Sequence, residues 1–166
     1  LGKLKEASLL DANVTHWHTD ARDASYCLNF AIAHLLNNQE EGKNFDLSVF
    51  LEHLLTKVEY EGTHIPLKIS EVLTMMQSPP SLDAVITLGT RGTAHETLAS
   101  ALYCFLTADS YHEMVINAIL AGGDADTRGA IVGALGGTLF GKEGIPFELV
   151  EKVEDSERIQ LIDQQL

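Results

Sequence analysis

A tract of small residues from Ala121 to Gly141, AGGDADTRGAIVGALGGTLFG, limits the folds open to this chain. Its apolar part predicts a helix in which glycine recurs every four residues, at Gly129, Gly133 and Gly137. Glycine inside a helix costs roughly 1 kcal/mol relative to alanine. We therefore expect a second backbone to approach closely along this groove. The 13 residues from Gly129 to Gly141 are too few for a membrane span, which needs about 20, so the tract predicts a buried helix of a soluble protein.

Three oxygen-bearing side chains, Asp124, Asp126 and Thr127, stand at the start of this predicted helix. Carboxylate and hydroxyl oxygens on one short turn can ligate a hard cation such as Mg²⁺, Mn²⁺ or Ca²⁺. Aspartate and threonine are also ordinary helix N-caps, which accept a hydrogen bond from a free backbone N–H. A cap needs only one acceptor, whereas two neighbouring carboxylates repel each other unless positive charge lies between them. From the residues alone, a metal site and a simple cap both remain open.

Composition narrows the class of protein. The 166 residues are 45% hydrophobic, which is enough for one core, so we expect a single domain over residues 1–166. The net charge of −13 would repel phosphate backbones and anionic lipids, which argues against nucleic-acid and membrane partners. Cys27 and Cys104 lie in apolar segments and are expected to be reduced core thiols of a cytoplasmic protein.

The apolar spacing predicts a succession of helices and no sustained strand pattern, which gives an all-α fold. Asp46 and Ser110 precede helical segments and are expected to be their N-caps. The expected helices cover about 19–37, 47–60, 66–77, 94–107, 111–120 and 124–141, with a charged, helical tail from 155. Residues 37–44 are expected to form a turn, and 82–88 either a helical turn or a strand.

Two further segments contain groups that could bind a metal ion or a phosphate. THWHTDARD holds His16, His18, Asp20 and Asp23, which can be imagined as a zinc site but are better explained as a polar loop followed by a helix cap. LGTRGT places glycines just before a helix, where free N–H groups can bind phosphate, although such loops more often only turn the chain.

Together these segments resemble the ADP-ribosylglycohydrolase family, the group that includes the dinitrogenase reductase-activating glycohydrolases. GGDADTRGAIVGALGGTLFG resembles the closing metal motif of that family, with Gly141 and Pro146 in the places of its later glycine and proline. Ala125 stands where the family more often has threonine, a change that leaves the ligand positions intact. THWHTDARDASYCLNFAIAHLL resembles the family's Thr-His segment, and the stretch from Gly92 to Thr127 resembles its penultimate helix pair.

The resemblance implies a hydrolase that removes ADP-ribose from a modified protein side chain or a small acceptor. Asp124, Asp126 and Thr127 would then be ligands of a pair of Mg²⁺ or Mn²⁺ ions. His16 would line the substrate cleft, and Gly123 would belong to the substrate site beside the metal ligands. Gly89 and Gly92 would approach the diphosphate.

One departure from the family pattern is clear. The family also takes metal ligands from an amino-terminal half with Gly-Asp and Thr-Asp-Asp motifs, and neither occurs here. The chain opens LGKLKE, without methionine, and resembles a carboxy-terminal portion. We therefore expect a fragment with weak metal binding and little turnover, unless the missing half or another chain supplies the remaining ligands. An inactive binding or structural protein of the same fold, and an unrelated all-α interaction module, are the alternative functions.

Overall fold

The computed structural model describes residues 2–40 and 46–163, and within these ranges the chain contains helices and no strand, which confirms the all-α prediction. The helices are α1 (Gly2–Asn13), α2 (Thr19–Glu40), α3 (Leu47–Thr56), α4 (His64–Met75), α5 (Leu82–Leu88), α6 (Ala94–Thr107), α7 (Tyr111–Leu120), α8 (Ala125–Phe140), the 3₁₀ helix η1 (Lys142–Gly144), α9 (Phe147–Glu151) and α10 (Ser156–Asp163). The turn expected at 37–44 was wrong for its first half, because α2 continues to Glu40; its second half, 41–44, lies outside the described residues.

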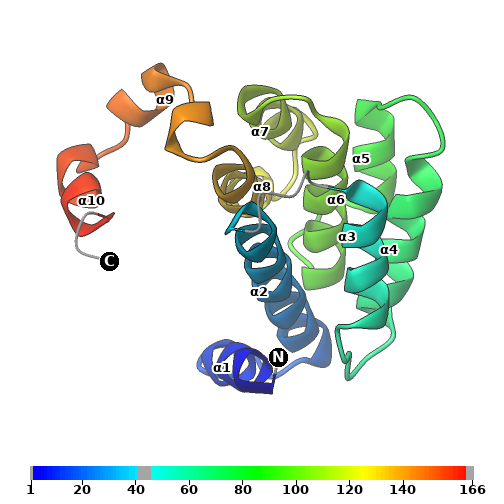
Figure 1. Cartoon of the computed structure of the whole chain (residues 1–166). Coiled ribbons are helices and arrows are strands. Elements are labelled where there is room, and N and C mark those ends of the chain that lie inside the picture. Colours follow the sequence, from blue (N-terminus) through cyan, green and yellow to red (C-terminus); the bar gives the residue numbers. More distant parts are fainter. Residues whose placement is uncertain (1, 41–45, 164–166) are drawn as a thin grey trace.

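Helix α6 lies at the centre of the fold (Figure 1), with α4 and α5 on one side and α2, α7 and α8 on the other. Ten consecutive residues, from Glu96 to Phe105, are buried, because neighbouring helices cover every face of α6. The core continues into α2 through Cys27, Ala31 and Leu35. A helix buried on all sides needs small residues as well as large ones, and TLASALYCF contains both, with Ala99, Ser100 and Ala101 between bulky side chains.

Side-chain caps set several helix starts as expected. The Val49 N–H donates to Asp46 Oδ1 at 3.1 Å, and the Glu113 N–H donates to Ser110 Oγ at 3.2 Å. Ser81 accepts from the Ala84 N–H at 3.2 Å, so 82–88 is a helix, not a strand. Helices α1 and α9 were not predicted from the sequence.

Helix α7 packs closely against α8, where the glycines lie. The atoms nearest to Gly129, Gly133 and Gly136 are side-chain atoms of α7, not backbone atoms. A Cβ on Gly136 would overlap the Met114 sulfur, and one on Gly133 would lie 3.2 Å from the Tyr111 hydroxyl. At Gly129 and Gly137 the nearest neighbour would be a side chain 3.9 Å away. Gly136, which lies outside the four-residue repeat, therefore makes the tightest contact with α7.

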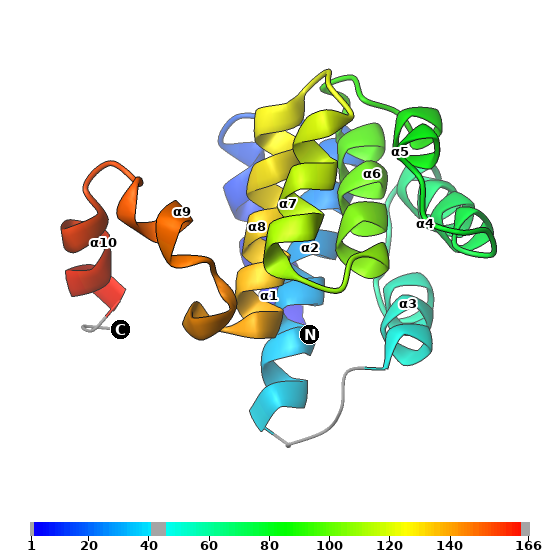
Figure 2. The ribbon, with the colours of Figure 1, turned by 90° about the horizontal axis from the view of Figure 1, so that it is seen from above.

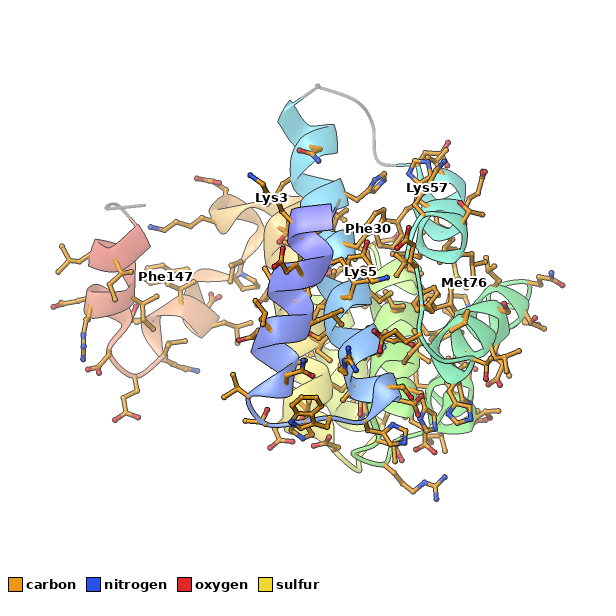
Figure 3. The ribbon with its side chains drawn as sticks, turned by 90° about the horizontal axis from the view of Figure 1, so that it is seen from below. Lys3, Lys5, Phe30, Lys57, Met76 and Phe147 are labelled. Carbon is orange, nitrogen blue, oxygen red and sulfur yellow. The ribbon has the colours of Figure 1, made fainter. Side chains whose placement is uncertain are left out.

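Helices α9 and α10 lie to one side of the bundle in both views (Figures 1 and 2). Figure 3 shows Phe147 at the start of α9, away from the bundle, and its side chain is 70% exposed. No helix in the described ranges has both the length and the apolar character needed to cross a membrane.

Cys27 and Cys104 are free and buried, as expected. Burial raises the pKa of Cys27 to about 12 and that of Cys104 to about 11. Both groups therefore remain protonated near neutral pH, and a protonated thiol is neither a nucleophile nor a metal ligand.

Candidate metal and substrate site

A cavity of about 860 Å³ lies where the starts of the four helices α2, α4, α6 and α8 meet. Most of the polar residues singled out from the sequence line it. The lining comprises His16, His18, Asp20, Ala21, Ala24, Ser25, Leu28, His64, Gly92, Thr93, Ala94, His95, Thr97, Leu98, Asp124, Thr127 and Ile131. Figure 2 shows that the α5–α6 and α7–α8 connections lie together at one end of the bundle, where they border this cavity.

Asp124 and Thr127 contribute their side chains to the cavity from the first turn of α8. Asp124 stands at the N-cap position but accepts no hydrogen bond from a backbone amide there. Its Oδ1 instead accepts a hydrogen bond from the Thr127 hydroxyl at 2.9 Å. Residues three apart on a helix lie side by side, so the spacing brings these two oxygens together. The capping explanation therefore does not account for the Asp124 carboxylate.

Asp126 is close to this pair but is exposed and is not part of the cavity lining. Its Oδ1 accepts the backbone N–H of Thr127 at 2.9 Å. This hydrogen bond, followed by one with the Asp124 side chain, holds the pKa of Asp126 below its ordinary value. Residues two apart on a helix do not face the same way, which explains why only one carboxylate of the pair faces the cavity.

The glycines of this region have different surroundings. A Cβ on Gly92 would lie 3.1 Å from Asp124 Oδ2, so glycine at this position gives the carboxylate room. Gly123, with φ +65°, is adjacent to Thr90; a Cβ there would overlap the Thr90 carbonyl oxygen, which accepts the Asp124 N–H at 2.8 Å. Gly123 is not itself in the cavity lining. Gly89, with φ +117°, faces the Glu96 side chain and also lies outside the lining.

An ion pair fixes the loop that carries Gly92. Arg91 Nη2 donates to Glu96 Oε1 at 2.6 Å, and the Arg91 backbone N–H donates to Oε2 at 3.1 Å. The hydrogen bond from the Arg91 side chain lowers the pKa of the buried Glu96 below its ordinary value, although burial opposes this effect. Glu96 therefore serves to hold the loop in place.

The THWHTDARD segment is divided by the fold. His16 and His18 line the cavity, and the His16 Nδ1 lies 2.8 Å from the Thr15 hydroxyl. Asp23 is buried, and its oxygens accept the backbone N–H groups of Glu61 at 2.8 Å and Gly62 at 2.7 Å. The four residues of the imagined zinc site are therefore not assembled, because Asp23 is used to bind the loop before α4.

Asp20 instead meets two histidines from other helices. Its Oδ2 lies 2.9 Å from His64 Nδ1 and 3.1 Å from His95 Nδ1. Burial would raise the pKa of Asp20, but the hydrogen bond and charge of His64, together with the hydrogen bond of His95, lower it overall. His64 and His95 are 44 and 75 residues from Asp20, so no local signal in the sequence indicated this cluster.

Arg128, which follows Thr127 in the first turn of α8, is fully buried. Its Nε donates to the Ala118 carbonyl at 2.8 Å, and its Nη2 donates to the Gly122 carbonyl. These carbonyls belong to the end of α7 and to the turn that follows. Arg128 therefore ties the start of α8 to the turn that carries Asp124.

Comparison with known proteins adds to this geometry. A sequence model of the ADP-ribosylglycohydrolase family matches residues 2–166. The chain is 38% identical over 71 residues to ADP-ribosylarginine hydrolase Tri1 of Pseudomonas putida (strain GB-1), covering 43% of this chain and 19% of that protein. It is 31% identical over 111 residues to ADP-ribosylhydrolase ARH3 of Mus musculus, covering 60% of this chain and 30% of that protein.

It is also 32% identical over 59 residues to the ADP-ribosyl-[dinitrogen reductase] glycohydrolase of Rhodospirillum rubrum, covering 36% of this chain and 20% of that protein. The matched segments thus span between 19% and 30% of the length of these three relatives. The family match, in contrast, extends over almost every residue of this chain. The all-α fold and the order of its segments agree with it, and the chain belongs to the ADP-ribosylglycohydrolase family.

Proposed function

We propose that this chain forms part of a metal-dependent hydrolase that removes ADP-ribose from a modified protein side chain or a small acceptor. The observation that carries the proposal is the pairing of Asp124 and Thr127 on the wall of a shared cavity. Its volume of about 860 Å³ suits a ligand of nucleotide size. The relatives whose names state an activity are all hydrolases or glycohydrolases of ADP-ribosyl groups.

The chemistry of the donors fits Mg²⁺ or Mn²⁺, which prefer oxygen ligands. Asp124 provides a carboxylate and Thr127 a hydroxyl oxygen, and Asp126 reaches the same ion if its exposed side chain turns away from the Thr127 amide. A bound divalent cation would supply Lewis-acid stabilisation and orient the ribose hydroxyls and the attacking water. Water, an amino-terminal half or another chain would provide the remaining ligands.

The other residues of the cavity would bind and orient the substrate. We propose that exposed His16 lies along the ribosyl group, and that the backbone around Gly92 lies near the diphosphate. Gly123 contributes indirectly, because its close approach to Thr90 sets the position of Asp124. Gly89 has the weaker case, since it faces Glu96.

We further infer that residues 1–166 act as one domain in the cytoplasm. A single core cluster that connects α2, α3, α4, α6 and α8 supports the first point. Two free thiols, the usual state of cysteine in a reducing compartment, support the second.

Titration calorimetry with Mn²⁺, followed by ADP-ribose, tests the proposal. Asp124→Asn should raise the dissociation constant for Mn²⁺ about tenfold or more, because it removes the charged ligand. Asp83→Asn is the matched control, since Asp83 also lies in the first turn of a helix but is exposed and outside the cavity. Thr127→Val should weaken binding and Thr127→Ser should preserve it. Equal Mn²⁺ affinity in Asp124→Asn and the parent chain would contradict the proposed metal site.

A further inference from the structure

The Asp20–His64–His95 cluster draws one side chain from each of three helices. Asp20 is the second residue of α2, His64 the first residue of α4 and His95 the second residue of α6. All three line the cavity. Their exposure increases from its floor to its mouth, since the side chains of Asp20, His95 and His64 are 9%, 26% and 61% exposed.

The three candidate ligand atoms lie within 4.8 Å of one another. Both Nδ1 atoms face the same oxygen, Asp20 Oδ2, at 2.9 and 3.1 Å. Zinc is bound by imidazole nitrogen and carboxylate oxygen at about 2.0–2.2 Å, so tetrahedral ligands lie roughly 3.4 Å apart. Opening each contact by a few tenths of an ångström would therefore admit an ion.

The charges around the cluster act on a bound cation in opposite directions. The first turns of α2, α4 and α6 direct their positive ends toward it, which favours the ionised form of Asp20. The same dipoles oppose a bound cation, so the carboxylate has to supply the compensating negative charge. Asp20 is thus expected to matter more for metal binding than either imidazole.

The ligand types select the class of metal. Imidazole nitrogens suit Zn²⁺ and neighbouring transition metals, whereas Mg²⁺ prefers a full set of oxygens. Three protein ligands leave a fourth position for water or substrate, the arrangement of open zinc sites. Each ring would carry its proton on Nε2 when Nδ1 binds the metal.

His18 is the nearest further imidazole. Its Nδ1 lies 3.8 Å from Asp20 Oδ2, but the same nitrogen accepts the Asp20 backbone N–H at 3.2 Å. That hydrogen bond uses the lone pair that a metal would need. The ligand set therefore excludes His18 and makes it a demanding control.

We propose that Asp20, His64 and His95 bind one transition-metal ion of the Zn²⁺ class, with its open coordination position facing the cavity. The site is separate from the oxygen-ligand site at Asp124 and Thr127, and it stands whether or not that site binds Mg²⁺ or Mn²⁺. It gives the cavity a second Lewis acid or a second anchor for an anionic ligand.

Co²⁺ provides the test, because tetrahedral Co²⁺ with nitrogen ligands absorbs visible light strongly and Zn²⁺ displaces it. The whole chain, freed of metal with a chelator, should develop this absorption with one equivalent of Co²⁺ and lose it on addition of Zn²⁺ but not of excess Mg²⁺. His64→Gln and His95→Gln should each weaken Co²⁺ binding roughly tenfold or more, since loss of a residue that merely orients a ligand costs about 10–100-fold. His64 is largely exposed, so its variant should fold normally, which far-UV circular dichroism checks.

Three controls separate this site from its surroundings. His18→Gln tests the neighbouring imidazole, and His112→Gln tests an exposed histidine on α7 outside the cavity lining; both should bind Co²⁺ as the parent does. Asp124→Asn should also retain the signal, even if it loses Mn²⁺. The proposal is overturned if the parent shows no visible absorption, if His64→Gln and His95→Gln bind as tightly as the parent, or if Asp124→Asn abolishes the signal.

Discussion

Replacing Arg128 with methionine tests whether a buried guanidinium holds the turn that carries Asp124 in place. Arg128 is 0% exposed, and its Nε and Nη2 donate to the carbonyls of Ala118 and Gly122. The last carbonyls of a helix have no partner within that helix and lie at its negative end. Arg128 thus provides a hydrogen-bond donor for a carbonyl at the end of α7 and anchors the turn before α8.

The expected loss follows from these contacts. Hydrogen bonds to charged groups contribute about 1.5–3 kcal/mol each, so two contribute about 3–6 kcal/mol. Arg128 Nη1 is buried without a hydrogen-bond partner among the described residues, and relief of such a group returns about 1–3 kcal/mol. Methionine retains much of the apolar volume, so Arg128→Met should lower the free energy of unfolding by about 2–3 kcal/mol, the loss less the return. The melting temperature should fall by roughly 4–12 °C for a chain of this size.

Urea unfolding followed by far-UV circular dichroism measures the effect. Arg158→Met on α10 is the matched control, because Arg158 is exposed, and it should change the free energy of unfolding by no more than about 0.5 kcal/mol. If Arg128→Met is as stable as the parent, the cost of burying the guanidinium outweighs its hydrogen bonds. That result would refute the anchoring role of Arg128.

Three further predictions use matched changes. Gly123→Ala and Gly122→Ala both place alanine at positive φ, which should lower the free energy of unfolding in urea by about 1 kcal/mol. Only Gly123→Ala also clashes with a backbone carbonyl, so it should lower that free energy by at least about 1 kcal/mol more. Equal losses of stability in the two variants would refute this contact. Gly136→Ala should destabilise the protein, because its Cβ would overlap the buried Met114 sulfur. Gly137→Ala has room for a Cβ and should raise the free energy of unfolding by up to about 1 kcal/mol. Calorimetric melting measures both effects, and stabilisation by both variants would contradict the Gly136 contact. The pKa of Glu96 is lower in the folded state than its unfolded value of about 4.3. The stability that Glu96 contributes is therefore present above that pH and is lost as the pH falls through the folded-state pKa. In urea unfolding, the free energy of unfolding should decrease less from pH 7 to pH 3 in Glu96→Gln than in the parent.

Most helices could be predicted from the sequence, because side-chain caps and apolar spacing depend on residues that are close together in the chain. Ser110 and Asp46 cap helices with their own side chains, and the apolar spacing of α2 places Cys27 and Leu35 in the core. Helix α1 gave no such signal, because its apolar residues are not gathered on one face; only Ser8 is fully buried there. Its position depends on packing against α2, which its own sequence does not specify.

The sequence by itself determined the helical class, the family resemblance and the Asp124–Thr127 pair, because a spacing of three residues on a helix fixes which side chains are neighbours. Only the tertiary structure decided that Arg128 is buried and that Asp20 meets His64 and His95. Contacts between residues 44 and 75 positions apart depend on how helices pack, and that packing is a property of the whole core.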